Sequence, residues 1–516
     1  MKKTILILGI IFLLIGLTFA PNINANINKS ISNNSKSNPQ KLSDKEILRL
    51  RYSDSSTQYR YVTEDGRTHI KTISKDELIS EQTQYYEDIP LILTIGCNGN
   101  HQPIYIDGND DFTPDNGVTG GSGTEGDPYI IENWVIVYDG IAEHGIFVND
   151  TDAYFIIRNC TISSFTKKYC AGIRLDKVEN GGFEDVDANQ NYIGMYITYS
   201  YYIIISNCTS HHNSIHGIGC YYCSNITITS CECYNNIEVG IQFAGTSYSV
   251  IENSMCYNNN RYGIEVGWCD FGDQVIYNTI KDCIIHHNRY LGIRLWRYSK
   301  DKHPGYTQIT RCEIYNNAID SGDAGIGIQW MHNNIIEDCN IHHNGRGIFI
   351  DGCSNNIIRN CSIFSQYIEG AVCAEGIMIG ATFIDLDLSI NNQIINCDIY
   401  DNEVGIWLCE AFGTKIYKNN VFNNSIDGIA INCIPFAIST GFVTYNNIYN
   451  NGFGDIEEWG FYTKLAIIDA RHNWWGSKLG PSTKIFPNRG DKLVTQFSFV
   501  LFRPWAKELI PDAGIQ

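Results

Sequence analysis

The sequence predicts an all-β fold, a single-stranded parallel β-helix of about 14 coils with terminal caps, from two repeated patterns. The first pattern is a column of mostly small polar residues that recurs every 22 to 36 positions. A sustained period of this size is typical of a solenoid of stacked units. The column consists of Asn133, Asn159, Asp185, Asn207, Ser230, Asn253, Asp282, Arg311, Asp338, Asn360, Asn396, Asn419, Asn446 and Asn473.

The surroundings of each column member predict a bend. In "IIEDCNI" around Asp338, apolar residues alternate with polar ones on both sides, but the alternation shifts by one position at Asp338. One residue therefore turns the chain without reversing it. Asn and Asp tolerate a positive φ better than other non-glycine residues, so we expect a left-handed bend once per coil. Side chains stacked in this way can also hydrogen-bond from coil to coil.

The second pattern is a glycine followed by alternating apolar residues, as in "GIRL" at 172, "GIEV" at 263 and "GIFI" at 347. This alternation is typical of a half-buried strand. An Asn often follows the bend residue by six positions, as Asn213 and Asn344 do, and is expected to end a strand in a turn. Three short strands per coil, with no helical period between them, predict parallel coils about 4.8 Å apart.

The two ends of the chain differ from the repeats. Residues 1–20 have the layout of a secretory signal peptide, which predicts a secreted or cell-surface protein, with a membrane contact only if that segment stays uncleaved. Residues 21–40 are rich in Asn and Ser and are expected to form a disordered linker. Residues 41–102 form an N-terminal segment without an assigned structure. The repeats predict a β-helix over 103–450, and the last coils and a C-terminal cap over 451–516.

The formal net charge of −19 limits the partners. It argues against nucleic-acid binding, which requires a basic surface. It also disfavours an acidic polysaccharide unless cations or a local basic groove assist.

Eight cysteines stand directly after a bend residue, at an inward-facing position. Cys behaves there as a small hydrophobic residue. Neighbouring coils would place the Cβ atoms about 4.8 Å apart, farther than the roughly 3.8 Å of a relaxed disulfide. We therefore expect free, buried thiols at Cys160, Cys208, Cys231, Cys283, Cys312, Cys339, Cys361 and Cys397.

Three His-His doublets, at 211–212, 286–287 and 342–343, fall where other coils carry a tyrosine such as Tyr234 or Tyr315. The position is suited to flat rings that stack on one another. The last two doublets are two coils, or about 9.6 Å, apart, so they cannot share one metal ion. We expect ring stacking and assign no metal ligands. Ca²⁺ held by Asp107, Asn109, Asp111 and Asp115 is the one cofactor considered, with a polar turn as the simpler interpretation.

Residues that could act on a ligand gather in the longer loops between 253 and 396, and insertions in repeat proteins collect on the binding face. Glu265 and Arg294 are expected to be cross-strand neighbours, and a surface ion pair is worth less than about 1 kcal/mol. Trp rings beside mixed charges suit a saccharide groove, with ordinary loop decoration as the alternative. The candidate catalytic residues are Glu265, Asp270, Asp273, Arg294, His303, Asp320 and Asp323, and the candidate substrate-binding residues are Trp268, Trp296, Arg297 and Trp330.

The stretch "NNIIEDCNIHHNGRGIFIDGCSNNIIRNCSI" (333–363) resembles the right-handed parallel β-helix repeat family, of pectin-lyase-like fold. The opening at 103–136 and the closing "NWWGSKLGPS" resemble exported prokaryotic members, many of them archaeal. These members are grouped with carbohydrate-binding and sugar-hydrolysis domains and with the NosD copper-accessory proteins. The resemblance, over about residues 100–505, implies right-handed coils and a polysaccharide or cell-surface glycan as partner.

The sequence favours an exported glycan-binding or structural rod. The alternative is a polysaccharide lyase or glycoside hydrolase with its site in the central loops, 265–330. A NosD-like copper-accessory role is the third possibility. The outward row of the Gly-initiated strands carries no pair of carboxylates, which glycoside hydrolysis usually requires.

Overall fold

The computed structural model describes residues 99–515, except 268–274, 298–304, 320–321, 368–373, 381–387, 432–438, 453–458, 465, 484, 486–488 and 497. It also describes the backbone of three strands nearer the N-terminus, β1 (Leu48–Ser53), β2 (Ser56–Val62) and β3 (Thr68–Ser74). These strands form an antiparallel sheet in the order β1-β2-β3, inside the first of two compact units, Met1–Gln82. The predicted signal peptide and linker lie outside the described residues.

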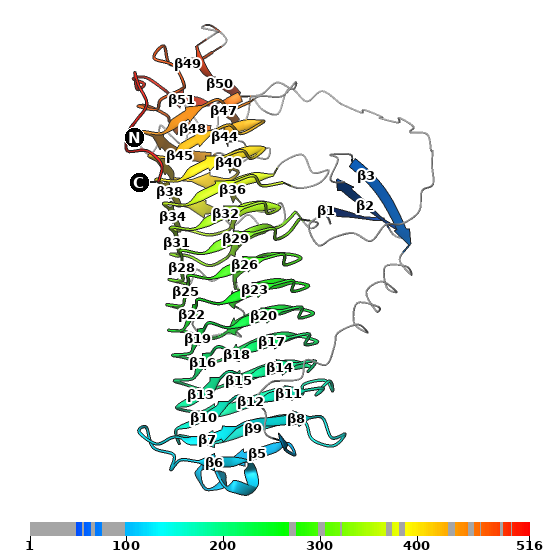
Figure 1. The fold of residues 1–516 in the computed structure, drawn as a ribbon. Coiled ribbons are helices and arrows are strands. Elements are labelled where there is room, and N and C mark those ends of the chain that lie inside the picture. The colour runs from blue at the N-terminus through cyan, green and yellow to red at the C-terminus, as the bar shows by residue number, and fades with distance from the viewer. Residues whose placement is uncertain are drawn as a thin grey trace, which may run out of the picture. The chain divides into compact units, whose positions relative to one another are not determined.

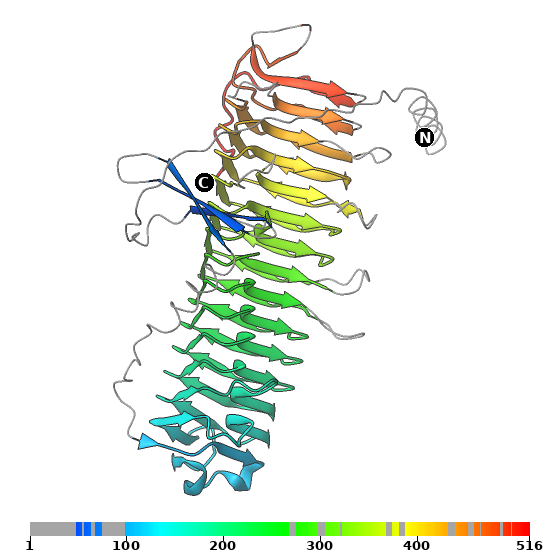
Figure 2. The same cartoon turned by 90° about the vertical axis from the view of Figure 1, so that its right-hand side faces the viewer.

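The second unit, Thr83–Gln516, contains a parallel β-helix built from three long sheets (Figures 1 and 2). The chain passes through the three sheets once per coil, and we name them sheet I, sheet II and sheet III in the order in which each coil visits them. Neighbouring strands of each sheet come from successive coils. This confirms the predicted all-β solenoid of about 14 coils. Among the residues that the structure describes, no helix has the length and hydropathy needed to cross a membrane.

Sheet I consists of β5 (Ile104–Asp107), β9 (His144–Thr151), β12 (Ala171–Val178), β15 (Ile193–Thr198), β18 (His216–Tyr221), β21 (Val239–Ala244), β24 (Tyr262–Gly267), β27 (Ile293–Trp296), β30 (Ala324–Gln329), β33 (Arg346–Asp351), β36 (Glu375–Gly380), β40 (Val404–Leu408), β44 (Asp427–Ile431), β47 (Trp459–Lys464), β50 (Gly490–Gln496) and β49 (Pro481–Ser482). Sheet II consists of β6 (Val118–Gly120), β7 (Tyr129–Glu132), β10 (Phe155–Arg158), β13 (Gly181–Glu184), β16 (Ile204–Ser206), β19 (Thr227–Thr229), β22 (Val250–Glu252), β25 (Thr279–Lys281), β28 (Gln308–Thr310), β31 (Ile335–Glu337), β34 (Ile357–Arg359), β38 (Gln393–Ile395), β42 (Thr414–Tyr417), β45 (Ser439–Thr444), β48 (Ala466–Asp469) and β51 (Phe499–Leu501). Sheet III consists of β4 (Gly99–Asn100), β8 (Trp134–Val137), β11 (Thr161–Ser163), β14 (Asp187–Asn189), β17 (Thr209–His211), β20 (Glu232–Tyr234), β23 (Met255–Tyr257), β26 (Ile284–His286), β29 (Glu313–Tyr315), β32 (Asn340–His342), β35 (Ser362–Phe364), β39 (Asp398–Tyr400), β43 (Asn420–Phe422) and β46 (Asn447–Tyr449). Two short strands, β37 (Ser389–Ile390) and β41 (Ala411–Phe412), form a separate two-stranded parallel sheet.

The first bend, between sheets II and III, follows the predicted column for eleven coils. Every predicted member from Asn133 to Asn396 has a positive φ, between 49° and 65°. The last three predictions are wrong by one residue, because Lys418, Tyr445 and His472 hold the positive φ. Asn419 and Asn446 instead point inward at the position of the cysteine column, and the backbone N–H of Cys397 donates to Asn419 Oδ1 at 2.9 Å.

The second bend, between sheets III and I, carries a continuous ladder of buried amides. Asn288 is a representative rung: its Oδ1 accepts from Asn259 Nδ2 at 3.0 Å, and its Nδ2 donates to Asn317 Oδ1 at 2.9 Å. The residue before each rung, such as His287, has the positive φ. These Asn residues are therefore ladder members and not the turn residues that the sequence predicted. The amide ladder runs through Asn191, Asn213, Asn236, Asn259, Asn288, Asn317, Asn344, Gln366, Asn402, Asn424 and Asn451, and ends at Asp491.

The third bend, between sheets I and II, was not predicted. It includes Tyr248, Tyr277 and Tyr306, each with a positive φ. Their exposed rings stack at centroid distances of 5.4 and 4.9 Å. Stacking offsets part of the cost of the left-handed backbone, which is higher for a bulky side chain than for Asn.

The interior is a column of β-branched side chains, one or two per strand, flanked by the thiols. Ile and Val suit a pleated, buried surface because their χ1 angle is already restricted. All fifteen cysteines that the structure describes are free and buried, which confirms the prediction for the eight that follow the first bend. Stability therefore comes from stacking each coil on the next.

The ends of the solenoid are covered. Two 3₁₀ helices, η1 (Asn109–Asp111) and η2 (Pro114–Asn116), lie at the N-terminal end, where the indole of Trp134 donates to the carbonyl of Gly117 at 2.9 Å. At the C-terminal end Trp475 is fully buried. The tail then returns along β46, and Ile510 exchanges two hydrogen bonds with the side chain of Asn447.

Candidate functional site

Sheet I presents one row of outward side chains, one from each coil. The strands pair in parallel and in register, so the row follows the predicted order through neighbouring strands. Its first eight members, on β5 to β27, are Tyr105, Phe147, Arg174, Tyr196, Gly219, Gln242, Glu265 and Arg294.

The N-terminal part of this row is accessible. Tyr105 is 54% exposed and meets the edge of Phe147 at a centroid distance of 5.3 Å. The guanidinium of Arg174 lies between two rings, 5.8 Å from the centroid of Phe147 and 4.7 Å from that of Tyr196. Partial burial raises the pKa of Tyr196, so its hydroxyl stays protonated at neutral pH. Four neighbouring strands thus present a strip of aromatic rings with a fixed cation among them.

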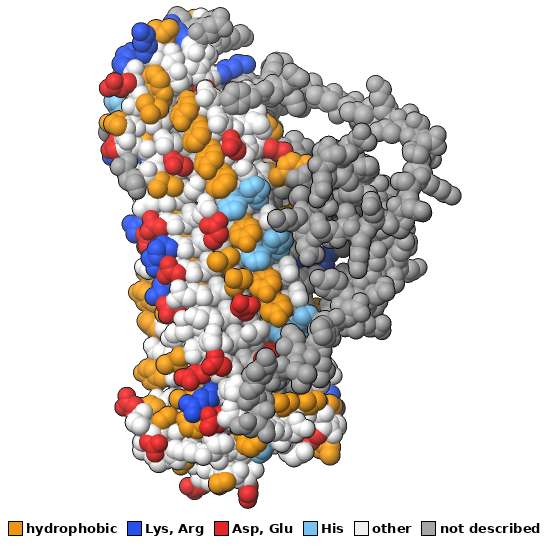
Figure 3. All heavy atoms as spheres, in the orientation of Figure 1, with side chains coloured by type: hydrophobic (Ala, Val, Ile, Leu, Met, Phe, Trp, Pro, Cys, Tyr) orange, Lys and Arg blue, Asp and Glu red, His pale blue; other side chains and the backbone are white. Residues whose placement is uncertain are grey.

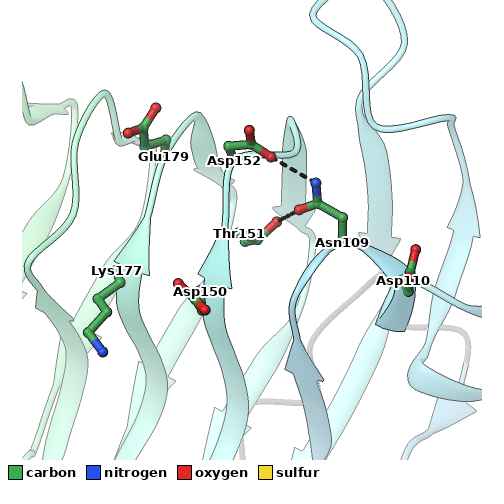
Figure 4. Close-up of a pocket in the computed structure, with 7 residues that line it drawn as sticks. All are labelled: Asn109, Asp110, Asp150, Thr151, Asp152, Lys177 and Glu179. Carbon is green, nitrogen blue, oxygen red and sulfur yellow. Dashed lines mark hydrogen bonds between the residues drawn. The ribbon is translucent and has the colours of Figure 1, made fainter.

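A polar depression of about 570 Å³ adjoins this strip, at the ends of β9 and β12 (Figure 4). Asn109 is held in it from both sides, donating to Asp152 Oδ1 at 2.8 Å and accepting from Thr151 Oγ1 at 2.5 Å. Lys177 is the one basic residue of the lining, and hydrogen-bonding oxygens dominate the rest. The depression is lined by Asn109, Asp110, Asp150, Thr151, Asp152, Lys177 and Glu179.

The central part of the row is buried. Glu265 accepts from Arg294 at 3.0 Å and from Gln242 Nε2 at 2.6 Å. The side chains of Glu265 and Arg294 are only 5% and 16% exposed. The predicted neighbours are confirmed, but their interpretation as a surface ion pair is wrong. The rings of Trp296 and Tyr262 lie 4.0 and 4.9 Å from the guanidinium of Arg294 and shield it from water.

The structure describes three of the other predicted site residues, Arg297, Asp323 and Trp330. Arg297 and Trp330 lie at the third bend in successive coils, where their backbone amides bond to the next coil. Asp323 precedes β30, and its carbonyl accepts from the backbone of Arg346 at 2.8 Å. Trp268, Asp270, Asp273, His303 and Asp320 lie outside the described residues. Of the predicted residues that the structure describes, Glu265, Arg294 and Trp296 lie together.

Three of the four residues considered for calcium, Asp107, Asn109 and Asp111, bond to protein groups. Asp107 Oδ1 accepts from Asn149 at 2.6 Å, and the backbone N–H of Asp107 donates to Asp111 Oδ2 at 3.1 Å. Within the described part of the chain, no group of three or more His, Cys, Asp or Glu residues is arranged to hold a metal ion. The bonds describe a polar turn, and calcium binding stays a prediction.

Sequence reasoning missed Tyr105 and the depression. The signal for Tyr105 is present, because "PIYID" at 103–107 has the same alternation as "GIFVN" at 145–149 and is its partner in the sheet. The depression is formed where η1 meets the ends of β9 and β12, and no local pattern in the sequence predicts that meeting.

Fold and repeat together define this protein as a parallel β-helix, as the resemblance of residues 333–363 predicted. The family described as "Right handed beta helix region" matches residues 144–272 and 271–385. A comparison with curated proteins found no match.

Several solved structures are similar in chain path. The A-module of the mannuronan C-5 epimerase AlgE6 from Azotobacter vinelandii is 13% identical, with 72% of this chain and 91% of that chain covered and a TM-score of 0.46. The periplasmic alginate epimerase AlgG is 13% identical, with 73% and 85% covered and a TM-score of 0.37. The pectate lyase Pel9A is 14% identical, with 79% of each chain covered and a TM-score of 0.26. At these identities the likeness concerns the fold, and the function must be argued from the residues of this chain.

Proposed function

We propose that this protein is an exported glycan-binding β-helix, which holds a linear polysaccharide against the outward row of sheet I. The supporting observation is the accessible strip of Tyr105, Phe147, Arg174 and Tyr196 on four neighbouring strands. Aromatic faces and edges contact the apolar faces of sugar rings, and the fixed guanidinium donates to hydroxyl or carboxylate oxygens. The signal-like residues 1–20 support action outside the cytoplasm.

The adjoining depression extends this site with hydrogen-bonding groups. A ligand pocket commonly combines ring surfaces with a few polar groups that fix orientation. Asp150, Asp152 and Glu179 can accept from sugar hydroxyls, and Lys177 can donate to them. The strip and the depression lie on the same strands, so one extended ligand can reach both.

Binding is favoured over turnover by the state of Glu265, the one carboxylate among the eight row members from Tyr105 to Arg294. One of its oxygens accepts from Arg294 and the other from Gln242. A general base must lie within reach of the substrate, and a hydrolase usually needs a second carboxylate. The side chain of Glu265 is only 5% exposed and already paired with Arg294, and these eight row members include no second carboxylate.

The test is affinity electrophoresis of the purified protein in gels that contain neutral or uronate-bearing polysaccharides. We expect at least one glycan to retard the wild type, and Phe147→Ala and Tyr196→Ala to weaken that retardation at least tenfold. Tyr277→Ala is the matched control, because Tyr277 is 50% exposed but lies at the third bend, away from the strip. Equal retardation of all variants, or none by any glycan, would remove the proposal.

The same glycans are assayed for new reducing ends and for unsaturated uronates. Turnover that Glu265→Gln abolishes would replace the binding function with the lyase or hydrolase alternative.

A further inference from the structure

The three His doublets share a geometry that the proposed glycan site does not use. The first His of each doublet ends a strand of sheet III, at His211, His286 and His342. It belongs to a column of ten stacked rings whose centroids are 4.8 to 5.3 Å apart. This ring column confirms the predicted stacking, and it appears in Figure 3 as a line of hydrophobic and His side chains on the surface of sheet III.

The second His of each doublet turns away from the column. His212, His287 and His343 each take the left-handed conformation of the second bend, with φ of 54°, 55° and 54°. Their rings stand at 81° to 88° to the first ring of the doublet. The two Nδ1 atoms of a doublet therefore point at the same place.

The Nδ1 atoms are 2.6 Å apart in doublet 211–212, 2.7 Å in 286–287 and 2.8 Å in 342–343. A single proton must lie between them, because two N–H groups would repel and two lone pairs would not bond. Each doublet thus directs two imidazole nitrogens at one shared hydrogen.

Carboxylates orient two of the doublets. His211 Nε2 lies 3.2 Å from Asp187 Oδ1, and His342 Nε2 lies 2.6 Å from Glu313 Oε1. The contact to Glu313 is a hydrogen bond and an ionised carboxylate only accepts, so Nε2 of His342 carries the hydrogen and its Nδ1 keeps the lone pair for the interior of the doublet. The contact to Asp187 is an ion-pair distance without hydrogen-bond geometry, and it favours the same tautomer in His211. Metal-binding histidines are commonly held in this way, with the remote N–H donated to a carboxylate.

We propose that each His doublet is a chelating site for one divalent transition-metal ion of the Zn²⁺ class, bound by the two Nδ1 atoms. The ion takes the place of the shared hydrogen, which moves through solvent to Nε2 of the second ring, so both rings bind as neutral imidazoles, and water completes the coordination. Bonds of about 2.0 to 2.1 Å at the tetrahedral angle that zinc prefers need nitrogens about 3.3 Å apart, so the rings must separate by about 0.5 to 0.7 Å. The spacing of the doublets excludes an ion shared between coils but not one ion in each doublet.

The doublets differ in a way that predicts their order of affinity. The position held by Asp187 and Glu313, one coil before the doublet, is occupied by Met255 before doublet 286–287. A carboxylate partner of a metal-binding His typically changes the affinity 10- to 100-fold. Doublets 211–212 and 342–343 are therefore the tighter sites, and 286–287 is the weaker one.

The experiment is calorimetric titration of the full-length, EDTA-treated protein with Zn²⁺, and with Co²⁺ as a spectroscopic probe. We expect two sites of similar affinity and a third that is 10- to 100-fold weaker, with Co²⁺ spectra that show nitrogen and no thiolate ligands. Asp187→Asn and Glu313→Gln should each weaken one site 10- to 100-fold, and Met255→Glu should strengthen the third.

Variants that preserve the fold are available in the chain itself. Other coils carry Asn235, Asn258 and Asn316 in the same left-handed position, so His212→Asn, His287→Asn and His343→Asn keep the bend. Each should remove one site. His472→Asn is the matched control, because His472 is a single His with φ of 64° at the first bend, and it should change nothing. A stoichiometry that is unchanged by the three bend variants, or Co²⁺ spectra with thiolate bands, would overturn the proposal.

Discussion

The two bends that flank sheet III fill the same inward position by different means. At the second bend every coil from Asn191 to Asn451 carries an amide, with Gln366 as the one variation. At the first bend thiols alternate with Val186 and Ser254 over the same length, and amides appear only in the last three coils.

The difference follows from what a buried polar group requires. A buried amide must find partners above and below, since an unmade hydrogen bond costs about 1 to 3 kcal/mol. A thiol is a weak donor that packs like a hydrophobic residue, so its neighbours need not match. An amide in one coil of the ladder therefore requires amides in the neighbouring coils, whereas the thiol column tolerates substitution at single positions.

The strongest test of this comparison is Asn288→Ala, in the middle of the ladder. In the wild type, Asn288 Oδ1 accepts from the backbone N–H of Asn259 at 3.1 Å and from its Nδ2 at 3.0 Å, and both donors lose this acceptor in the variant. The change also removes the bonds that Asn288 Nδ2 donates to Cys256, His286 and Asn317. We expect a loss of about 4 kcal/mol in the free energy of unfolding, mainly from the two buried donors left without an acceptor. Cys283→Val at the first bend should cost less than about 1.5 kcal/mol. Urea denaturation measures both, and equal losses would contradict the distinction.

Arg294→Ala extends the comparison to a buried charge. Glu265 would keep one hydrogen bond, from Gln242, but lose its cation. Leaving a buried charge uncompensated costs on the order of 3 kcal/mol. Lys281→Ala is the control, because Lys281 pairs with Glu252 at 2.7 Å with both side chains more exposed, and its loss should cost under about 1 kcal/mol. Similar urea midpoints for the two variants would show that burial does not matter here.

Asp491, at the end of the ladder, tests the cost of burying a polar group through the pH dependence of stability. Asp491 accepts from Asn451, and burial raises the pKa of its carboxyl from 3.8 to about 6. The folded state therefore holds this proton more tightly than the unfolded state, and its stability falls as pH rises from about 4 to 6. Asp491→Asn should remove that fall, with a gain of about 3 kcal/mol above pH 6 and none below pH 4. Melting temperatures of both proteins across this pH range measure the effect. A gain in stability that does not depend on pH would refute the raised pKa of Asp491.

The smallest effect is expected at the polar turn near the N-terminal end. The side chains of Asp107, Asn109 and Asp111 already bond to protein groups, as ladder amides do. Addition of EGTA, or of Ca²⁺ after EGTA, should leave the melting temperature unchanged. A rise of several degrees with Ca²⁺ would establish the calcium site that the sequence raised.

The sequence predicts the solenoid well because period and alternation are local properties. It predicts the first bend correctly until Asn396 and then selects Asn419, although Lys418 takes the positive φ. Asn is both the best left-handed residue and the best ladder residue, so its presence alone does not distinguish the two roles. Aligning Val421 with Ile399, both buried on sheet III, would have placed Asn419 under Cys397.

The candidate site was less predictable. The order of the outward row on sheet I follows from the alternation, and the contact between Glu265 and Arg294 was predicted for that reason. Its burial depends on how rings from neighbouring positions, such as Tyr262 and Trp296, fold over the row. The third bend was missed because tyrosines such as Tyr277 take a backbone conformation that propensity assigns to Asn or Gly.

The amide ladder also makes each coil an exchangeable module. Asn213, Asn236 and Asn259 follow one another at intervals of 23 residues, and each repeats the bonds of the one before. Excision of residues 236–258 would bring Asn259 onto Asn213 with every donor and acceptor matched. A protein of this kind can therefore lengthen or shorten by whole turns, through duplication or deletion of gene segments, without the need to evolve a new interface.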